Sequence, residues 1–405
     1  MSAPAAEATL VALRHNRDFA VFWSCQTLSA VGDAMSLVAL PLLVLHATGS
    51  VAQMGLLTAS GTLGYVVAGM FAGVVVDRVD RRRLMIGCDL ARALLFALVP
   101  LAWLAGPQIW LLYAVMPLGA VLGMTFQVSY VTVIPHLVGT MQITAANGVL
   151  QSGFATAGIG GTAFGGVLCA AFGPPVAVAT DAATFAVSAA GIAAVRFSRP
   201  ETARSSASPR SEFLAGVRFL SRNPVLRSLT VLLTVELLFT LGITDAVIFH
   251  IKHDIGSSDA AVGLVLAVAG IGSALAGSTV AFARRRLRFA VCWIGATAIS
   301  GLAVAGIGVS QGIYAVAALD GVYLSALTFA GTCSMSLRQQ ITPDHLLGRV
   351  TSAFWTIHYA TSPIGAAVLT AAIQRYSTAS VLLVAGVTCA AVALCGAFTP
   401  IANQQ

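Results

Sequence analysis

Three acidic residues lie inside long apolar stretches of the chain: Asp33, Glu236 and Asp320. A carboxylate at the centre of a membrane-spanning helix costs about 2.5–3.5 kcal/mol on insertion scales, so each position calls for a functional explanation. Surroundings of low dielectric constant favour the protonated form of a carboxyl group, which can then exchange a proton or compete for a cation. We therefore predict proton coupling or substrate binding at these residues, with a hydrogen-bonded link between helices as the alternative for Asp33.

Asp33 is the first candidate because it lies about fourteen residues, or roughly 21 Å of helix, into its apolar stretch. Two other charged sites are expected to be structural. Asp89 and Arg92 are three residues apart on one helix face, so we predict an ion pair between them near the cytoplasmic end of the third span. Asp181 is expected to serve a helix start or a packing contact.

Polar and aromatic residues within other apolar stretches are predicted to form cavity walls: Gln127, Tyr130, Tyr323, His358 and Tyr359. Cavities that bind small molecules combine apolar contact with a few placed polar groups. His358 can titrate, although a lone histidine is more often a packing residue. No spacing matches a catalytic triad or a metal site, so we expect no enzyme activity, no metal and no cofactor.

Composition indicates which elements position these residues. The chain has 405 residues, of which 58% are hydrophobic and only 9% charged, whereas soluble domains carry about 25% charged residues. This excludes soluble and disordered classes and predicts an all-α membrane protein. The single lysine, Lys252, follows Ile251, so a Walker A loop is excluded. The seven cysteines are odd in number and form no Cys-x-x-Cys pair, which favours core positions over disulfides or zinc.

Apolar windows of about 20 residues, the length that crosses a bilayer, predict twelve spans. They cover 19–46, 52–76, 84–103, 109–133, 143–171, 173–197, 225–251, 259–283, 289–309, 312–337, 346–374 and 378–400. The two longest windows, 143–171 and 346–374, are expected to contain interfacial turns or a strong tilt. A polar stretch divides the chain into a six-helix bundle at 1–197, a cytoplasmic linker at 198–224 and a second six-helix bundle at 225–405.

Basic residues predict the orientation. They cluster before the first span, after the second, around the linker and after the eighth, so both termini and the linker are expected to be cytoplasmic. The net charge of +7 is therefore interpreted as a topology signal rather than a nucleic-acid surface. The N-terminal segment contains Glu7 and lacks the pattern of a removable signal peptide.

The two halves of the chain also look duplicated. Arg81-Arg82-Arg83-Leu84 after the second span recurs as Arg284-Arg285-Arg286-Leu287 after the eighth. One common offset relates Gly55, Gly64, Gly69 and Pro135 to Gly263, Gly272, Gly277 and Pro343. Parallel repeats of this kind predict a substrate site near the bilayer midplane and rocking of one half against the other.

The loop after the second span carries the pattern Gly73, Asp77, Arg78, Arg81 and Arg82. With this motif the chain resembles the major facilitator superfamily, over essentially its whole length. The resemblance implies two six-helix bundles, a central cavity lined by spans one, four, seven and ten, and a gating role for the motif. Asp33, Glu236 and Asp320 would then point inward. The sequence departs from the family pattern at Asp80, where glycine is usual.

A second stretch, in span five, resembles the glycine-rich motif of drug–proton antiporters in this superfamily. Gly148, Gly161 and Gly165 keep the spacing, whereas Ala157 and Thr162 replace a glycine and the proline. Close helix packing is the alternative explanation for these glycines. The opening segment from Arg14 and the segment from Leu337 to Phe354 further resemble the enterobactin-exporter-like and macrolide-efflux-like branch.

The sequence therefore favours a monomeric, proton-coupled exporter of a small, mostly hydrophobic compound in the inner or plasma membrane. Its expected partners are the substrate, protons and the lipid bilayer. A nutrient symporter is the alternative within transport. A receptor or an intramembrane enzyme on a transporter scaffold is the alternative outside it, and the chain has neither a signalling domain nor a catalytic constellation.

Overall fold

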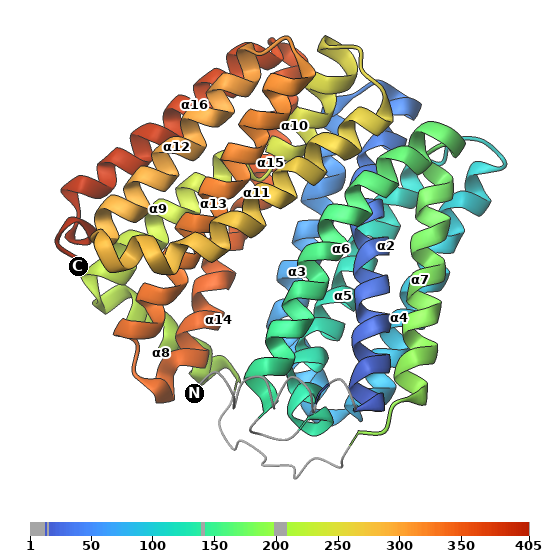
Figure 1. Ribbon diagram of the computed structural model, residues 1–405, viewed down its shortest axis with the longest axis horizontal. Coiled ribbons are helices and arrows are strands. Elements are labelled where there is room, and N and C mark those ends of the chain that lie inside the picture. Colours follow the sequence, from blue (N-terminus) through green and yellow to red (C-terminus); the bar gives the residue numbers. More distant parts are fainter. Residues whose placement is uncertain (1–12, 14–15, 139–141, 198–208, 405) are drawn as a thin grey trace. The chain divides into compact units, whose positions relative to one another are not determined.

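The computed structural model describes residue 13 and residues 16–138, 142–197 and 209–404, and in this part of the chain the fold is helical with no strands. The all-α prediction is therefore confirmed. Eleven of the described segments are long and apolar enough to cross a membrane. The remaining predicted window, 346–374, is filled by two shorter helices, α14 (Asp344–Ala360) and α15 (Ser362–Arg375), on either side of Thr361. Figure 1 shows this helical architecture.

The chain forms two compact units, one of Met1–Leu43 with Gly64–Ser205 and one of Val44–Leu63 with Ser206–Gln405. The helices that lie wholly in the first unit are α4 (Arg81–Trp103), α5 (Ile109–Leu137), α6 (Ile143–Phe172) and α7 (Pro174–Ala194). Two helices contribute residues to both units, α2 (Arg17–Thr48) and α3 (Val51–Arg78).

The second unit is built from more and shorter helices. They are α8 (Pro209–Arg222), α9 (Pro224–Thr240), α10 (Ile243–Phe249), the π-helical segment η2 (His250–Asp254), α11 (Asp259–Arg286), α12 (Phe289–Val309), α13 (Ile313–Ile341), α14 (Asp344–Ala360), α15 (Ser362–Arg375), α16 (Thr378–Cys395) and the 3₁₀ turns η3 (Gly396–Phe398) and η4 (Pro400–Asn403). Within this unit α12 packs along α16 and α11 along α13 (Figure 1).

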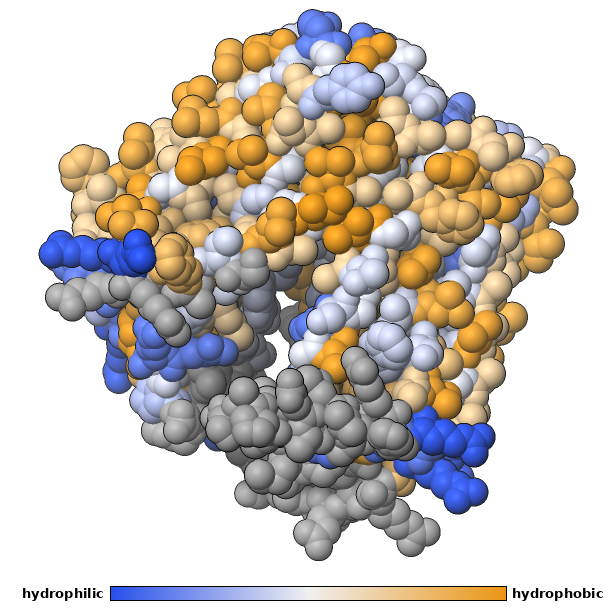
Figure 2. Space-filling model, in the orientation of Figure 1, coloured by the Kyte–Doolittle hydropathy of each residue, from blue (hydrophilic) through white to orange (hydrophobic). Residues whose placement is uncertain are grey.

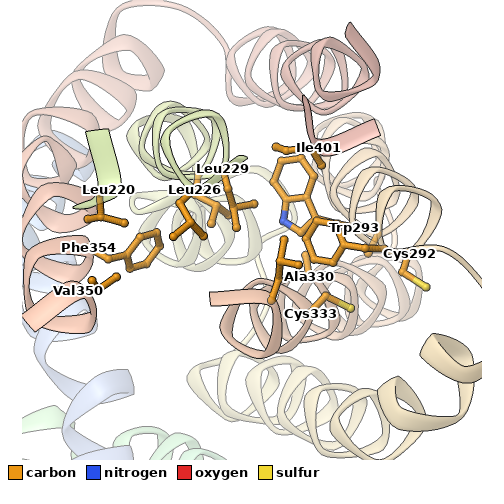
Figure 3. Packing of buried hydrophobic residues seen from close by; sticks show 14 of the residues in the cluster. Leu220, Leu226, Leu229, Cys292, Trp293, Ala330, Cys333, Val350, Phe354 and Ile401 are labelled. Atoms are coloured by element: carbon orange, nitrogen blue, oxygen red, sulfur yellow. The ribbon is translucent and has the colours of Figure 1, made fainter. Parts of the chain in front are cut away.

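Each unit has its own apolar core. In the second unit Trp293 is completely buried between Ile401 and the α13 residues Ala330 and Cys333 (Figure 3). In the first unit a second cluster gathers around Phe22 and Tyr130. Large apolar side chains also cover the outside of the helices, and hydrophilic residues gather near helix ends (Figure 2). This distribution suits a protein whose outer surface faces lipid.

Candidate functional site

Asp33 forms an ion pair in the middle of the first unit. Arg92 Nη2 donates to Asp33 Oδ1 at 2.6 Å, and the two residues lie near the centres of α2 and α4 respectively. The Asp33 side chain is 48% exposed, whereas that of Arg92 is 13% exposed. The Arg92 guanidinium also lies 3.8 Å from the centroid of the Phe185 ring on α7. The carboxylate is thus accessible while its cationic partner is held in place.

The predicted ion pair between Arg92 and Asp89 is wrong. Arg92 pairs instead with Asp33 on another helix, and it lies at mid-helix in α4 rather than near the cytoplasmic end. Asp89 is buried beside Ser188 of α7. Residues three apart share a helix face, but here the packing of α2 against α4 decides which carboxylate the guanidinium reaches.

Asp181 extends this ion pair into a buried polar network. It is completely buried on α7, accepts a hydrogen bond from Ser36 of α2, and lies 3.3 Å from Thr184 Oγ1. A Cβ on Gly32 would lie 2.5 Å from Asp181 Oδ1, so α2 and α7 approach each other through this glycine. Asp181 is a packing contact, as predicted, and it also lies close enough to Asp33 to act on it electrostatically.

A further polar cluster lies inside the second unit. Glu236 on α9 is buried beside Ser300 of α12 and Cys389 of α16. Asp320 and Tyr323 lie one turn apart on α13, and both are buried. Tyr323 is close to Glu236 as well as to Asp320. The structure therefore brings together Glu236, Asp320 and Tyr323, three residues that the sequence singled out separately.

The remaining predicted wall residues have different surroundings. Gln127 is exposed on α5, whereas Tyr130 is buried in the core, stacked 5.6 Å from Phe22. On α14, His358 stacks on Phe354 at 5.4 Å and Tyr359 on Trp355 at 5.6 Å. The side chains of His358 and Tyr359 are partly exposed.

The described part of the motif after α3 organises the start of α4. The side chains of Gly73, Asp77 and Arg78 lie outside the described residues, and Arg81 starts α4. Arg82 donates to the backbone oxygens of Ile192 and Ala193 at the end of α7, where helix carbonyls lack partners within the helix. Asp80 accepts a hydrogen bond from Arg83 N at 2.9 Å and so caps α4. This cap explains why an aspartate stands where the family pattern has glycine.

We expect Asp80→Ala to lower the free energy of unfolding by about 1 kcal/mol, because the cap at the start of α4 is lost. Thermal unfolding of the purified protein in one detergent measures the effect. Asp80→Asn is the matched control, since an amide oxygen still accepts from Arg83 N. Equal melting points for the alanine and asparagine variants would contradict the capping role.

Two of the three glycines predicted to permit helix packing lie against α2. A Cβ on Gly161 would lie 2.6 Å from Val31 O, and one on Gly165 would lie 2.9 Å from Met35 Cα. Nothing lies within 4 Å of the corresponding position at Gly148. The close approach of α6 to α2 therefore depends on Gly161 and Gly165 but not on Gly148.

These glycines give a matched pair of alanine variants on one helix. We expect Gly161→Ala to destabilise the protein by about 1–3 kcal/mol through overpacking against α2. Gly148→Ala should be neutral or stabilising by up to about 1 kcal/mol, because alanine is the better helix former. Melting points of the two variants relative to the parent chain measure the difference. The packing argument fails if the two substitutions have the same effect.

Residues 44–63 carry a polar cluster that the sequence did not reveal. Within the second unit, Lys252 Nζ lies 2.7 Å and His46 Nε2 lies 3.3 Å from Asp259 Oδ1. Nearby, η2 lines a cavity of about 440 Å³, and its lining includes His250 and Asp254, with His250 Nδ1 2.7 Å from Asp254 Oδ2. The contact of His46 with Asp259 joins residues far apart in the chain, so no local spacing could have indicated it, whereas His250 and Asp254 are four residues apart.

The fold and this site define a polytopic membrane protein of the transporter class, with ionisable side chains paired inside its helices. The family model of the Major Facilitator Superfamily matches residues 22–366. The chain therefore belongs to this superfamily, as the motif after α3 suggested, and the superfamily comprises transporters rather than enzymes.

The chain is also similar to two curated relatives and to one solved structure. It is 27% identical over 349 residues to the multidrug efflux pump Tap of Mycolicibacterium fortuitum, with 83% of this chain and 84% of that protein covered. It is 29% identical over 136 residues to macrolide efflux protein A of Streptococcus pyogenes, covering 33% of each chain. The crystal structure of the nucleoside transporter NupG has a TM-score of 0.76 at 14% identity and covers 96% of this chain and 100% of that one. The last similarity concerns the fold alone.

Proposed function

We propose that this transporter exports a small, mostly hydrophobic compound by proton-coupled alternating access. The export direction is supported by the relatives, which are named a multidrug efflux pump and a macrolide efflux protein. Coupling is supported above all by the ion pair between Asp33 and Arg92. In this proposal the protein works as a monomer with both termini in the cytoplasm.

The ion pair between Asp33 and Arg92 provides a way to exchange a proton for substrate. When neither proton nor substrate is bound, Arg92 neutralises the half-exposed Asp33 carboxylate. A proton on Asp33, or a cationic group of the substrate, removes the need for that pairing, because either one compensates the same negative charge. Binding of proton and substrate is thereby mutually exclusive at one carboxylate, which is the condition for antiport.

The surrounding network ties this exchange to helix positions. Ser36 and Asp181 join α2 to α7, and Arg92 joins both helices to α4. A change in the charge of Asp33 therefore acts on three helices at once. Glu236 and Asp320 are proposed as further coupling or substrate groups, and the motif from Gly73 to Arg82 as a gate in which loss of Asp77 slows turnover more than it weakens binding.

Proteoliposomes test this function. A candidate drug or dye trapped with the protein should be exchanged when a pH gradient is imposed, and a protonophore should abolish the gradient-driven part. Counterflow without a gradient should persist. Movement of solute with the proton rather than against it would indicate a symporter, and the absence of any exchange under either condition would show that the proposal is wrong.

A further inference from the structure

Arg338 is a buried cation with no acidic partner among the described side chains. It lies in the last turn of α13 and is 2% exposed. Its Nε and Nη1 atoms have no hydrogen-bond partner, and Nη2 donates only to the sulfur of Met335 at 3.2 Å. No carboxylate of the described residues pairs with it.

Aromatic rings hold the guanidinium in place. Its carbon lies 3.4 Å from the centroid of Phe354 and 5.4 Å from that of Trp355. Phe354 is fixed in turn by the apolar core, where it lies near Leu220 and Val350 (Figure 3). Cation–π contact compensates only part of the cost of removing an ion from water, and the described side chains supply no anion for the remainder.

Other unpaired polar atoms surround this charge. The hydroxyl groups of Ser334 and Thr342 lack hydrogen-bond partners. Ser334 lies one turn before Arg338 on the same face of α13, and Thr342 is the residue directly after the end of α13. His358 Nδ1 also lacks a partner, and its ring is close enough to Arg338 for the two to interact electrostatically. Buried polar atoms normally have hydrogen-bond partners, so a cluster of buried polar atoms without such partners indicates a ligand-binding site.

The duplicated half of the chain shows that packing does not require the charge. Tyr130 and Arg338 are separated along the chain by the same number of residues as Pro135 and Pro343, so they are corresponding positions of the two halves. Tyr130 fills its place with a neutral ring, stacked 5.6 Å from Phe22 and 5.7 Å from Phe154. The second unit has an arginine at the corresponding place, with no acidic partner among the side chains that the structure describes.

We propose that Arg338, Ser334 and His358, with the rings of Trp355 and Tyr359, bind the acidic group of a planar aromatic compound. Trp355 covers the guanidinium, is 40% exposed and stacks on Tyr359 with an interplanar angle of 21°. Rotation of such an exposed side chain is fast and uncovers the cation for a carboxylate or sulfonate, whose ring then stacks on the aromatic pair. This inference goes beyond the proposed function: it places a second ligand class, aromatic acids, at Arg338 in the second unit, apart from the exchange proposed at Asp33.

Two probes with the same ring system and opposite charge test the site. Naphthalenesulfonate and naphthylmethylammonium are titrated by calorimetry into the full-length protein in nanodiscs. The parent chain should prefer the anion, and Arg338→Met should weaken anion binding at least about tenfold, the loss expected for a charged hydrogen bond. Binding of the cation should be unchanged or tighter. Arg227→Gln, which removes an exposed arginine of the same unit, should leave both affinities unchanged.

Stability without ligand provides the second measurement. Arg338→Met removes an unpaired buried charge, so its melting point should equal or exceed that of the parent chain. A lower melting point together with unchanged probe affinities would assign Arg338 a purely structural role and overturn the proposal, as would failure of the parent chain to bind the anion. Because these titrations use no gradient, anion binding without proton-driven transport would refute the proposed function and leave this site standing.

Discussion

We expect Asp33→Asn to abolish the proposed proton-driven efflux and to leave the protein folded. Asparagine keeps a carbonyl oxygen that can accept from Arg92 Nη2, so the link between α2 and α4 survives without a negative charge. It cannot take up or release a proton, so the exchange proposed for this residue stops. Efflux from proteoliposomes under a pH gradient measures the loss, which we expect to reach the level of protein-free vesicles.

Counterflow and a second variant complete this experiment. Because Asp33→Asn mimics the protonated state, exchange of an uncharged substrate without a gradient should continue in it. Asp18→Asn makes the same chemical change in the first turn of α2 and should transport normally. Intact gradient-driven efflux in Asp33→Asn at normal expression would exclude this residue as the coupling site.

Much of the fold followed from the lengths of the apolar runs. The window 289–309 coincides with α12, and 143–171 is extended by a single residue in α6. These limits were predictable because glycine, proline and charged residues mark the ends of the runs. Interfacial turns or a strong tilt were expected for both long windows. The structure has an unbroken α6 in one and a break at Thr361, near the middle of the window, in the other.

The interruptions inside spans were less predictable. Hydropathy reports whether a segment is apolar and says nothing of where its hydrogen bonding changes, so the break between α9 and α10 and the π-helical segment η2 were missed. The linker likewise contains α8, which packs against α14 through a close contact of Gly216 with Arg349 O. A polar stretch of this composition suggested only a connection.

The candidate site was also only partly predictable from the sequence. Asp33 was found because a carboxylate in an apolar run is costly, which is a property of the sequence alone. Its partner was missed because Arg92 has Asp89 on its own helix face, and only the packing of α2 decides between the two carboxylates. The burial of Arg338 could not be predicted either, because position along the chain places a residue near a helix end but does not say which face it occupies.

Arg92→Gln should inactivate gradient-driven transport as fully as the change at Asp33. Without the guanidinium, the Asp33 carboxylate loses the cation that compensates its charge, so the exchange proposed at this ion pair stops. Arg92→Lys keeps the charge but not the planar group that lies over Phe185, so it should retain part of the activity. Initial efflux rates at equal protein density measure the series.

A double-mutant cycle identifies the carboxylate that Arg92 serves. Unfolding free energies of Asp33→Asn, Arg92→Gln and the double variant should give a coupling energy of about 0.5–3 kcal/mol, the range for residues in contact. The parallel cycle with Asp89→Asn should give a smaller value, because Asp89 is not ion-paired with Arg92. A larger coupling to Asp89 would restore the pairing that the sequence suggested. It would also remove the guanidinium from the proposed exchange at Asp33, since one cation cannot neutralise both carboxylates at once.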